Sequence, residues 1–306
     1  MVINIFVILI ISLIFPGVIS LTKAKIVGTK GTSIWQPFFD NIRLFKKGSV
    51  FSTTTSWIFQ VAPIIYFSTI FVALFFIPVG SKAAVLSFEG DFVLFAYLLA
   101  LGKFMMILAA MDTGSGFEGM GANRETFYSM LVEPAFFIVI ASMALLTNHT
   151  SFYELFNNLH LESELSYLIA ILAVYIFLWI AMAENSRLPV DDPKTHLELT
   201  MIHEVMVLDY SGFDLALIQL TNGIKFSIYG ALIFNFILPM QNYFAAQLFV
   251  LFIVEFLFAI SVGTLESFRA RNKMAKNPQW IMSLSALAIV GFLAVLIITG
   301  KIILIN

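Results

Sequence analysis

Residues 166–183 read SYLIAILAVYIFLWIAMA, an apolar run without a charged residue that stops at Glu184. A helix needs about 20 such residues to cross the roughly 30 Å hydrocarbon layer of a bilayer. Seven further blocks of this kind lie near Val2–Leu21, Trp57–Val79, Phe92–Met111, Thr126–Thr147, Asp214–Pro239, Tyr243–Leu265 and Trp280–Leu304. The sequence therefore predicts an all-α polytopic membrane protein with about eight transmembrane helices, forming a single transmembrane domain over residues 1–306.

Composition supports this class. Hydrophobic residues make up 60% of the 306 positions and charged residues 12%, whereas a soluble domain averages about 25% charged and under 50% apolar residues. The chain contains no cysteine, so it can form no disulfide and hold no cysteine-bound iron–sulfur cluster. The net charge of −2 gives no indication of nucleic-acid binding.

The distribution of basic residues predicts the orientation. The connections after the first, third, fifth and seventh blocks carry most of the Lys and Arg, whereas those after the second, fourth and sixth carry only Lys82. By the positive-inside rule both termini lie on the outer side. The cytoplasmic loops are then expected at residues 22–56, 112–125, 184–213 and 266–279.

The first of these loops has an amphipathic pattern. Trp35, Phe39 and Phe45 alternate with polar residues such as Arg43, as in helices that lie along a membrane surface.

The third loop is dense in acids and is expected to contain a helix. Asp192 can cap it, Pro193 suits its first turn, and Thr195 with Glu198 has capping-box spacing. On such a helix Glu198 and Asp209 would share one face. Acids crowded beside apolar spans favour proton handling or the docking of a soluble partner.

The ionisable residues inside the spans include Lys103, Glu133, Lys225 and Glu255. Each costs at least about 2.5 kcal/mol in the membrane centre unless it is paired or hydrated. Pro134 follows Glu133 and predicts a kink there, which makes Glu133 a candidate proton relay. The alternative is a pair that fixes helix packing, for example Glu255 with Lys225.

Two further motifs indicate no classical ligand site. The glycine-rich run over residues 112–121 lacks the Lys-Ser/Thr pair of a phosphate-binding loop, so we expect a close-packed loop that contacts a partner or lines a cavity. His196 and His203 do not have His-Glu-x-x-His spacing. No metal site and no catalytic residue are expected in this chain.

Three stretches together resemble the subunit 1 family of respiratory complex I, the heel subunit of its membrane arm. Residues 35–44, WQPFFDNIRL, are similar to that family's Gln-Pro-x-x-Asp-x-x-Lys-Leu signature. Residues 183–191, AENSRLPVD, resemble Ala-Glu-Thr-Asn-Arg-x-Pro-Phe-Asp. Glu133 stands where the family carries a glutamate in its fourth span, and the family also has eight spans.

The resemblance is closer to the branch found in membrane-bound [NiFe] hydrogenases of the formate hydrogenlyase and hydrogenase-4 type. It is carried by residues 191–204 (DDPKTHLELTMIHE), by residues 208–212 (LDYSG), and by residues 112–115 (DTGS) with Arg124 and Glu125 after them. Quinone-reducing members carry Gly-Pro-Asn after the first span, where this chain reads GTKGTS at residues 28–33. They also carry a Tyr-Glu pair where this chain reads LVEP at residues 131–134. Both differences disfavour quinone binding.

The resemblance implies a coupling subunit in the plasma membrane of a prokaryote. It would bind no cofactor itself and would anchor hydrogenase-like large and small subunits that carry iron–sulfur clusters and a [NiFe] centre. Antiporter-like membrane subunits would be its neighbours, and electron transfer would be linked to proton or sodium movement.

The resemblance also gives candidate residues. The acidic path from arm to membrane would comprise Asp112, Glu118, Glu133, Glu184, Asp191, Asp192, Glu198, Glu204 and Asp209. Nearby cations lower a carboxylate pKa and burial raises it, so the charge state of these acids would be set by Arg124, Arg187, Lys103 and Lys225. Docking of the partner is expected at Gln36, Pro37, Asp40 and Arg43.

Two alternatives stay open at this stage. A quinone-reducing NADH dehydrogenase subunit would share the fold and would have a lipid-acceptor cavity near residues 35–44 and 133–134. A free-standing ion-coupled transporter would instead use broken helices at mid-membrane, which fits less well because the densest acids lie in a loop.

Overall fold

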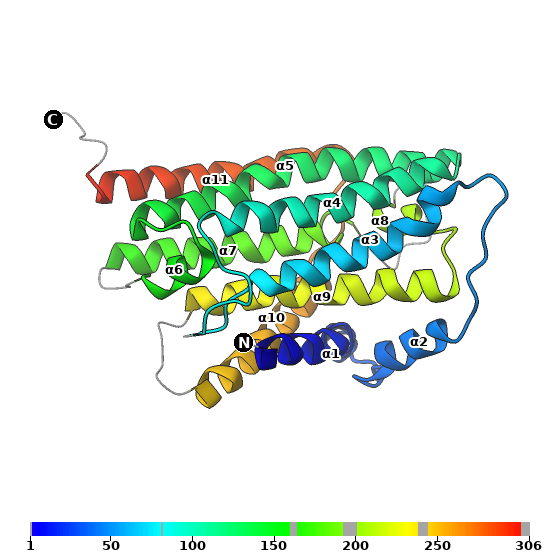
Figure 1. The fold of residues 1–306 in the computed structure, drawn as a ribbon, viewed down its shortest axis with the longest axis horizontal. Coiled ribbons are helices and arrows are strands. Elements are labelled where there is room, and N and C mark those ends of the chain that lie inside the picture. Colours follow the sequence, from blue (N-terminus) through cyan, green and yellow to red (C-terminus); the bar gives the residue numbers. More distant parts are fainter. Residues whose placement is uncertain (1, 81, 160–163, 192–200, 238–243, 301–306) are drawn as a thin grey trace.

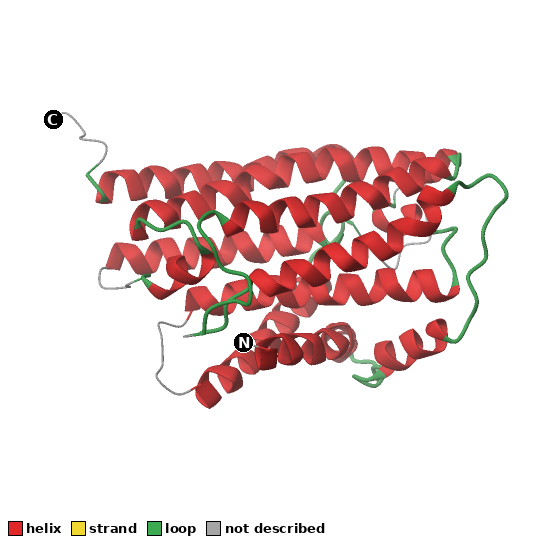
Figure 2. Ribbon diagram, in the orientation of Figure 1, coloured by secondary structure: helices red, strands yellow, loops and turns green. Residues whose placement is uncertain are grey.

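The helices of the protein follow the apolar blocks of the sequence. In the computed structural model, eight helices are long and apolar enough to span a membrane: α1 (Val2–Val27), α3 (Trp57–Ala73), α4 (Asp91–Asp112), α5 (Gly116–Thr147), α7 (Glu164–Glu184), α9 (Gly212–Ile237), α10 (Phe244–Phe268) and α11 (Asn277–Ile298). The structure describes residues 2–80, 82–159, 164–191, 201–237 and 244–300, and these ranges contain no named strand. The all-α fold with eight candidate spans is confirmed (Figure 2).

Five short helical segments complete the described ranges: α2 (Gln36–Phe45), α6 (Phe152–Asn157), α8 (His203–Met206) and the 3₁₀ turns η1 (Leu74–Phe76) and η2 (Met274–Lys276). Helix α9 is the central element (Figure 1), because α1, α2, α3, α7 and α10 all pack against it. The apolar window of α9 is 83% buried, whereas that of α11 is 22% buried. Any charged group on α9 must therefore find its partner inside the bundle.

The predicted cytoplasmic loops meet at one end of the bundle. The backbone amide of Val50 donates to the Ser211 hydroxyl at 3.0 Å, and the amide of Asp209 donates to Glu118 at 3.4 Å. The amide of Asn272 donates to the Pro189 carbonyl at 3.0 Å. Loops after alternate spans thus gather together, as expected for loops on one side of a membrane.

Helix α2 forms in the amphipathic stretch of the first loop. Pro37 occupies its first turn, where a missing amide proton costs nothing. None of its residues is buried, and Trp35, Phe39 and Phe45 are 47%, 51% and 37% exposed. Its position along a membrane surface stays a prediction.

Helix α5 begins at Gly116, earlier than the expected Thr126. Ser115 is extended at the N-cap position, and Glu118 lies in the first turn, where a carboxylate interacts favourably with the helix dipole. Part of the glycine-rich run is therefore helical; Gly121 at its end is close-packed, whereas Gly114, Gly116 and Gly119 have nothing within 4 Å of a Cβ position. A Cβ on Gly121 would lie 2.8 Å from the Ile202 carbonyl oxygen.

The helix expected in the third loop is much shorter in the described residues. Residues 192–200, Glu198 among them, lie outside the described residues; between Met201 and Tyr210 only His203–Met206 is helical, so a helix that continues to Asp209 is wrong. The physical reason is tertiary bonding that turns the chain after Met206. Asp209 bonds Glu118 through its amide, and the Tyr210 hydroxyl donates to the Phe59 carbonyl at 2.9 Å.

Gly121→Ala is expected to destabilise the protein because its Cβ would lie 2.3 Å from Val205 Cγ1 and 2.8 Å from a backbone oxygen. Gly119→Ala is the matched control on the same helix, since nothing lies within 4 Å of its Cβ position. Alanine is worth about 0.5–1 kcal/mol over glycine inside a helix, so the control should melt at the same or a higher temperature. Thermal unfolding in detergent measures both. Equal melting temperatures would contradict the close contact.

Candidate functional site

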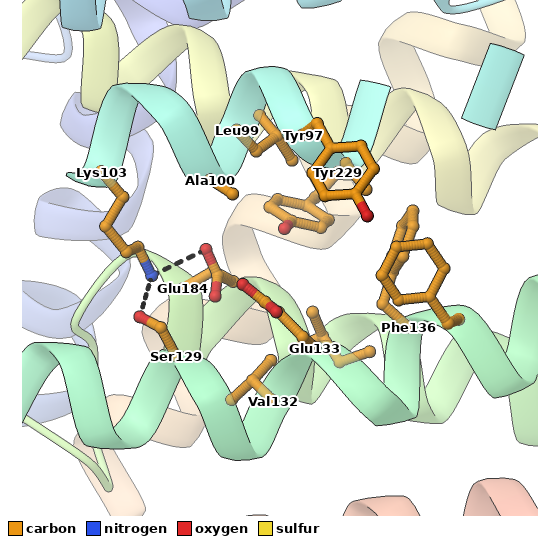
Figure 3. A pocket seen from close by; sticks show the side chains of 13 residues that line it. Tyr97, Leu99, Ala100, Lys103, Ser129, Val132, Glu133, Phe136, Glu184 and Tyr229 are labelled. Atoms are coloured by element: carbon orange, nitrogen blue, oxygen red, sulfur yellow. Dashed lines mark hydrogen bonds and ion pairs between the residues drawn. The ribbon is translucent and has the colours of Figure 1, made fainter. Parts of the chain in front are cut away.

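Four helices bring charged side chains together inside the bundle. Lys103 Nζ of α4 lies 2.9 Å from Glu184 Oε2 of α7, 3.1 Å from Glu125 Oε1 of α5, and 2.8 Å from the Ser129 hydroxyl (Figure 3). Lys225 Nζ of α9 lies 2.8 Å from the same Glu184 oxygen. We call these five residues the lysine cluster.

The lysine cluster is balanced in charge and shielded from solvent. Its side chains are 12% exposed at Lys103, 6% at Glu125, 10% at Glu184 and 2% at Lys225. Removing one partner of a buried pair leaves an uncompensated charge, at a cost of about 3–5 kcal/mol. Two cations and two carboxylates compensate one another, so the cluster holds α4, α5, α7 and α9 together.

The position of Glu184 at the end of α7 adds a second interaction. Lys225 Nζ also donates to the Glu184 backbone carbonyl at 2.7 Å. The last carbonyls of a helix have no partner within the helix and carry the negative end of its dipole. The lysine therefore satisfies both the side chain and the backbone at the point where the chain leaves the membrane.

Glu133 lies next to the lysine cluster on the same face of α5. Glu125, Ser129 and Glu133 follow one another at four-residue spacing, which places them on one helix face. Glu133 and Glu184 line a common cavity of about 70 Å³ together with Lys103, Ser129 and Tyr229 (Figure 3). Glu133 is exposed in the isolated chain, although it lies within a candidate span.

A larger cavity of about 650 Å³ opens between α2, α9 and the third loop. We call it the loop cavity. Its polar and charged lining includes Asp40, Arg43, Lys47, Asn185, Arg187, His203, Glu204 and Asn222. Its apolar lining includes Pro16, Leu44 and Phe226. A cavity with this mixed lining suits an amphiphilic ligand or an inserted loop of a partner.

The residues predicted to dock a partner lie on α2 at this cavity. Pro37, Asp40 and Arg43 line it. The Gln36 side chain donates to Asp40 Oδ1 at 2.8 Å, and Arg43 Nη1 lies 3.5 Å from the same oxygen. The structure brings these residues together at one surface, and their docking role stays a prediction.

A chain of polar contacts leads inward from the loop cavity. His203 Nε2 lies 3.2 Å from Asn222 Nδ2, and the Tyr66 hydroxyl donates to Asn222 Oδ1 at 2.7 Å. These polar groups extend from the loop cavity through Asn222 of α9 to Tyr66 of α3.

Burial shifts the two titratable groups of α8 in opposite directions. Burial lowers the pKa of His203; Lys225 and Lys103 act in the same direction, and Glu125 opposes them. Burial and the charge of Asp191 raise the pKa of Glu204, and Arg187 opposes that rise. The opposition of burial and a cation expected from the sequence is thus present at Glu204.

Arg187 is also part of a network at the cavity wall. Its Nη1 lies 3.4 Å from Glu266 Oε1, and Lys23 Nζ lies 2.8 Å from Glu266 Oε2. The guanidinium lies 5.2 Å from the centre of the Phe226 ring, within range of a cation–π interaction. Glu266, which the sequence interpretation missed, thereby joins α1, α10 and the third loop.

Asp191 organises the loop itself. It is fully buried, and its Oδ2 accepts hydrogen bonds from the amides of Ile202 and His203, both at 3.1 Å. Arg271 Nη2 lies 2.9 Å from Oδ1. The carboxylate thus caps the start of α8 and bonds the fourth loop to the third.

Three other predicted residues have packing partners at the loop end. Asp112 Oδ2 accepts two hydrogen bonds from Ser56 at the start of α3, at 2.7 and 2.9 Å. Glu118 accepts the Asp209 amide. Arg124 Nη1 donates to the Met201 carbonyl at 3.0 Å. These contacts hold the loops together, and the predicted roles in coupling stay predictions.

The structure corrects one suggested pair and adds one residue. Lys225 binds Glu184 and not Glu255, whose oxygens have no hydrogen-bond partner among the described residues. Glu125 was missed as a site residue, although its four-residue spacing to Ser129 and Glu133 was a usable signal. Asp192 and Glu198 lie outside the described residues. No group of three or more potential metal ligands occurs in the part of the chain that is described.

Comparisons with known proteins identify the family of the chain. The model of the NADH dehydrogenase family matches residues 2–296. The chain belongs to this family of complex I subunit 1-like proteins. The resemblance inferred from residues 35–44, 133 and 183–191 is confirmed.

Hydrogenase-4 component C of Escherichia coli (strain K12) is 29% identical over 94% of this chain and 93% of its own length. Formate hydrogenlyase subunit 4 of the same strain is 24% identical over 86% of this chain and 85% of its own length. A subunit of the NADH-quinone oxidoreductase of Rubrobacter xylanophilus is 27% identical over 63% of this chain and 57% of its own length.

One solved structure shows the same fold over almost the whole chain. A subunit of the membrane-bound sulfane sulfur reductase, an archaeal respiratory membrane complex, superimposes with a TM-score of 0.81 at 21% identity, covering 96% of this chain and 97% of that subunit. This chain therefore shares its fold with that subunit.

Lys225→Met is expected to destabilise the protein by about 3–5 kcal/mol, because the lysine cluster would keep two buried carboxylates and only one cation. The double variant Lys225→Met with Glu184→Gln restores the balance and should recover part of the loss. Lys30→Met, at an exposed position, is the control. Unfolding in detergent is measured for these three variants and for Glu184→Gln alone. Losses that simply add in the double variant would show that the residues are not coupled.

The lowered pKa of His203 predicts a loss of stability in acid. A group whose folded pKa lies below its ordinary 6.5 contributes stability above that pH, and the contribution is lost as pH falls through the folded value. His203→Gln should therefore lose less stability than the wild type between about pH 7 and about pH 5. The raised pKa of Glu204 changes stability with pH in the opposite direction. Because Glu204 is present in both the wild type and the variant, its contribution does not distinguish them. Parallel melting curves would contradict a buried neutral histidine.

Proposed function

We propose that this chain is the membrane-anchoring and coupling subunit of a complex I-like energy-converting [NiFe] hydrogenase. Membership of the complex I subunit 1-like family, with near full-length similarity to components of hydrogenase-4 and formate hydrogenlyase, supports the class of complex. The iron–sulfur clusters and the [NiFe] centre belong to partner subunits of a peripheral arm. The complex lies in the plasma membrane of a prokaryote.

The observation that carries the coupling role is the continuity between the loop end and the lysine cluster. Glu184 ends α7 and belongs to the cluster, and the residues immediately after it, Asn185 to Arg187, line the loop cavity. A partner that presses on this loop changes the position of a carboxylate bound by two lysines. Redox-linked movement in the arm is thereby converted into a change of charge balance inside the membrane.

Glu133 is the group through which a proton leaves the chain. It shares a cavity with Glu184, and its side chain extends into that cavity toward Glu184 (Figure 3). A carboxylate at mid-span facing lipid is costly, so such residues normally face a protein or a hydrated cavity. An antiporter-like membrane subunit against α5 would cover Glu133 and receive the proton or exchange it for sodium.

A quinone-reducing dehydrogenase subunit is the second candidate, and the loop cavity is the observation in its favour. Its mixed apolar and charged lining next to α2 suits a head group with a lipid tail. The similarity to the NADH-quinone oxidoreductase of Rubrobacter xylanophilus covers 63% of this chain. The differences at residues 28–33 and 131–134 from the quinone-type signatures favour the hydrogenase assignment.

The first test is purification of the tagged native chain in mild detergent, followed by mass spectrometry of its partners and a hydrogen-evolution assay. We expect [NiFe] large and small subunits to co-purify with hydrogen activity. A flavin-bearing arm that reduces quinone would transfer the assignment to the second candidate. Recovery of the chain without partners would overturn both.

In the active complex, Glu133→Gln separates electron transfer from ion movement. We expect hydrogen evolution with an artificial electron donor to persist, while the ion gradient formed in sealed vesicles falls several-fold. Glu89→Gln, an exposed acid before α4, is the control and should leave both unchanged. An unchanged gradient in the Glu133 variant would remove this residue from the path.

A further inference from the structure

Glu255 is a buried carboxyl that the lysine cluster does not use. It lies in the middle of α10, its exposed fraction is 0%, and neither oxygen has a hydrogen-bond partner among the described residues. The small cavity beside it is lined by Ile11, Ile14, Phe15 and Val18 of α1 and by Phe252, Phe256 and Ala259 of α10. None of these residues is charged or titratable.

Helix α9 also contacts Glu255, in addition to α1, and it leaves space for the carboxyl. A Cβ built on Gly230 of α9 would lie 2.3 Å from Glu255 Oε2, 2.6 Å from Cδ and 2.8 Å from Oε1. The carboxyl therefore occupies the volume that any side chain at position 230 would fill. The absence of a side chain at Gly230 of α9 thus leaves the space that the carboxyl from α10 fills.

Helix α9 separates this acid from the lysine cluster. Tyr229, the residue before Gly230, lines the cavity that contains Glu133 and Glu184. Gly230 contacts Glu255, and α10 packs against α9 and α1. Two carboxyl sites thus adjoin consecutive residues of one helix, one with lysine partners and one without.

The absence of a counter-charge among the described residues decides the chemical form of the group. Burying an ionised carboxylate without a partner is far more costly than burying the neutral acid, which needs at most one or two hydrogen bonds. The cost is greater still in a membrane span. We propose that Glu255 is a second proton-binding site, a carboxylic acid that carries its proton at neutral pH within the α1–α9–α10 contact.

This site has a defined reactivity. A protonated carboxyl in an apolar environment adds to a hydrophobic carbodiimide: its proton moves to one carbodiimide nitrogen, and its oxygen bonds the central carbon. The acyl group then migrates to nitrogen, and the adduct keeps every atom of both reactants. The exposed faces of Phe252 and Phe256, at 47% and 41%, flank the cavity on the outer surface of α10 and give the reagent an apolar approach.

The protonation state is read directly by infrared spectroscopy of the purified complex. The wild type minus Glu255→Gln difference should contain the carbonyl band of a protonated carboxylic acid at neutral pH. The Glu133→Gln variant should retain that band. A carboxylate band in its place would show that Glu255 is ionised and paired, which overturns the proposal. This readout does not involve hydrogenase activity, so it is independent of the proposed function.

Carbodiimide labelling tests the site in the wild-type complex. Peptide mass spectrometry of the wild-type complex should find the full mass of dicyclohexylcarbodiimide added at Glu255, and no addition of a charged, water-soluble carbodiimide in the same time. Gly230→Ala should change the dicyclohexylcarbodiimide labelling several-fold, because it displaces the carboxyl. Absence of the adduct, or equal labelling by the water-soluble reagent, would overturn the proposal.

Discussion

The structure depends on the compensation of one carboxylate, Glu184, by two lysines from different helices. A charge inside the bilayer must be paired or hydrated, so Lys103 and Lys225 can be placed only where α4, α7 and α9 meet. Glu125 supplies the second negative charge from α5. The electrostatic requirement therefore specifies which four helices pack together, in a chain whose lipid-like surfaces would otherwise allow many arrangements.

Helix α9 lies between two sites that meet the requirement for compensated charge in different ways. It is the most buried span, and it carries Lys225 and Asn222 toward the cluster and the loop cavity. Gly230 gives space to a carboxyl of α10. A single helix thus separates a paired, charge-balanced site from an apolar one. Movement of α9 relative to either neighbour would change the environment of titratable groups on both sides.

The sequence was sufficient for the span count and for the family, because long apolar blocks and short signatures are local properties. It also indicated Glu133, since an acid before a proline within a span is a local signal. It could not give the partner of Lys225, because Glu184 and Glu255 are equally plausible in sequence and only packing separates them. The expected helix does not reach Asp209 for the same reason: tertiary hydrogen bonds to Glu118 and Phe59 hold the chain in a turn after Met206.

In the proposed function, docking of the arm and coupling depend on the same segment of the chain. The residues that follow Glu184 line the loop cavity, and Asp191, a few residues later, bonds both α8 and the fourth loop. A soluble arm seated on these loops must therefore act on the segment that ends in the lysine cluster. Two lysines and two carboxylates give that cluster a neutral resting state, so any displacement of Glu184 leaves a lysine undercompensated. In the proposed function, Glu133, which lines the same cavity as Glu184, restores the balance by releasing a proton.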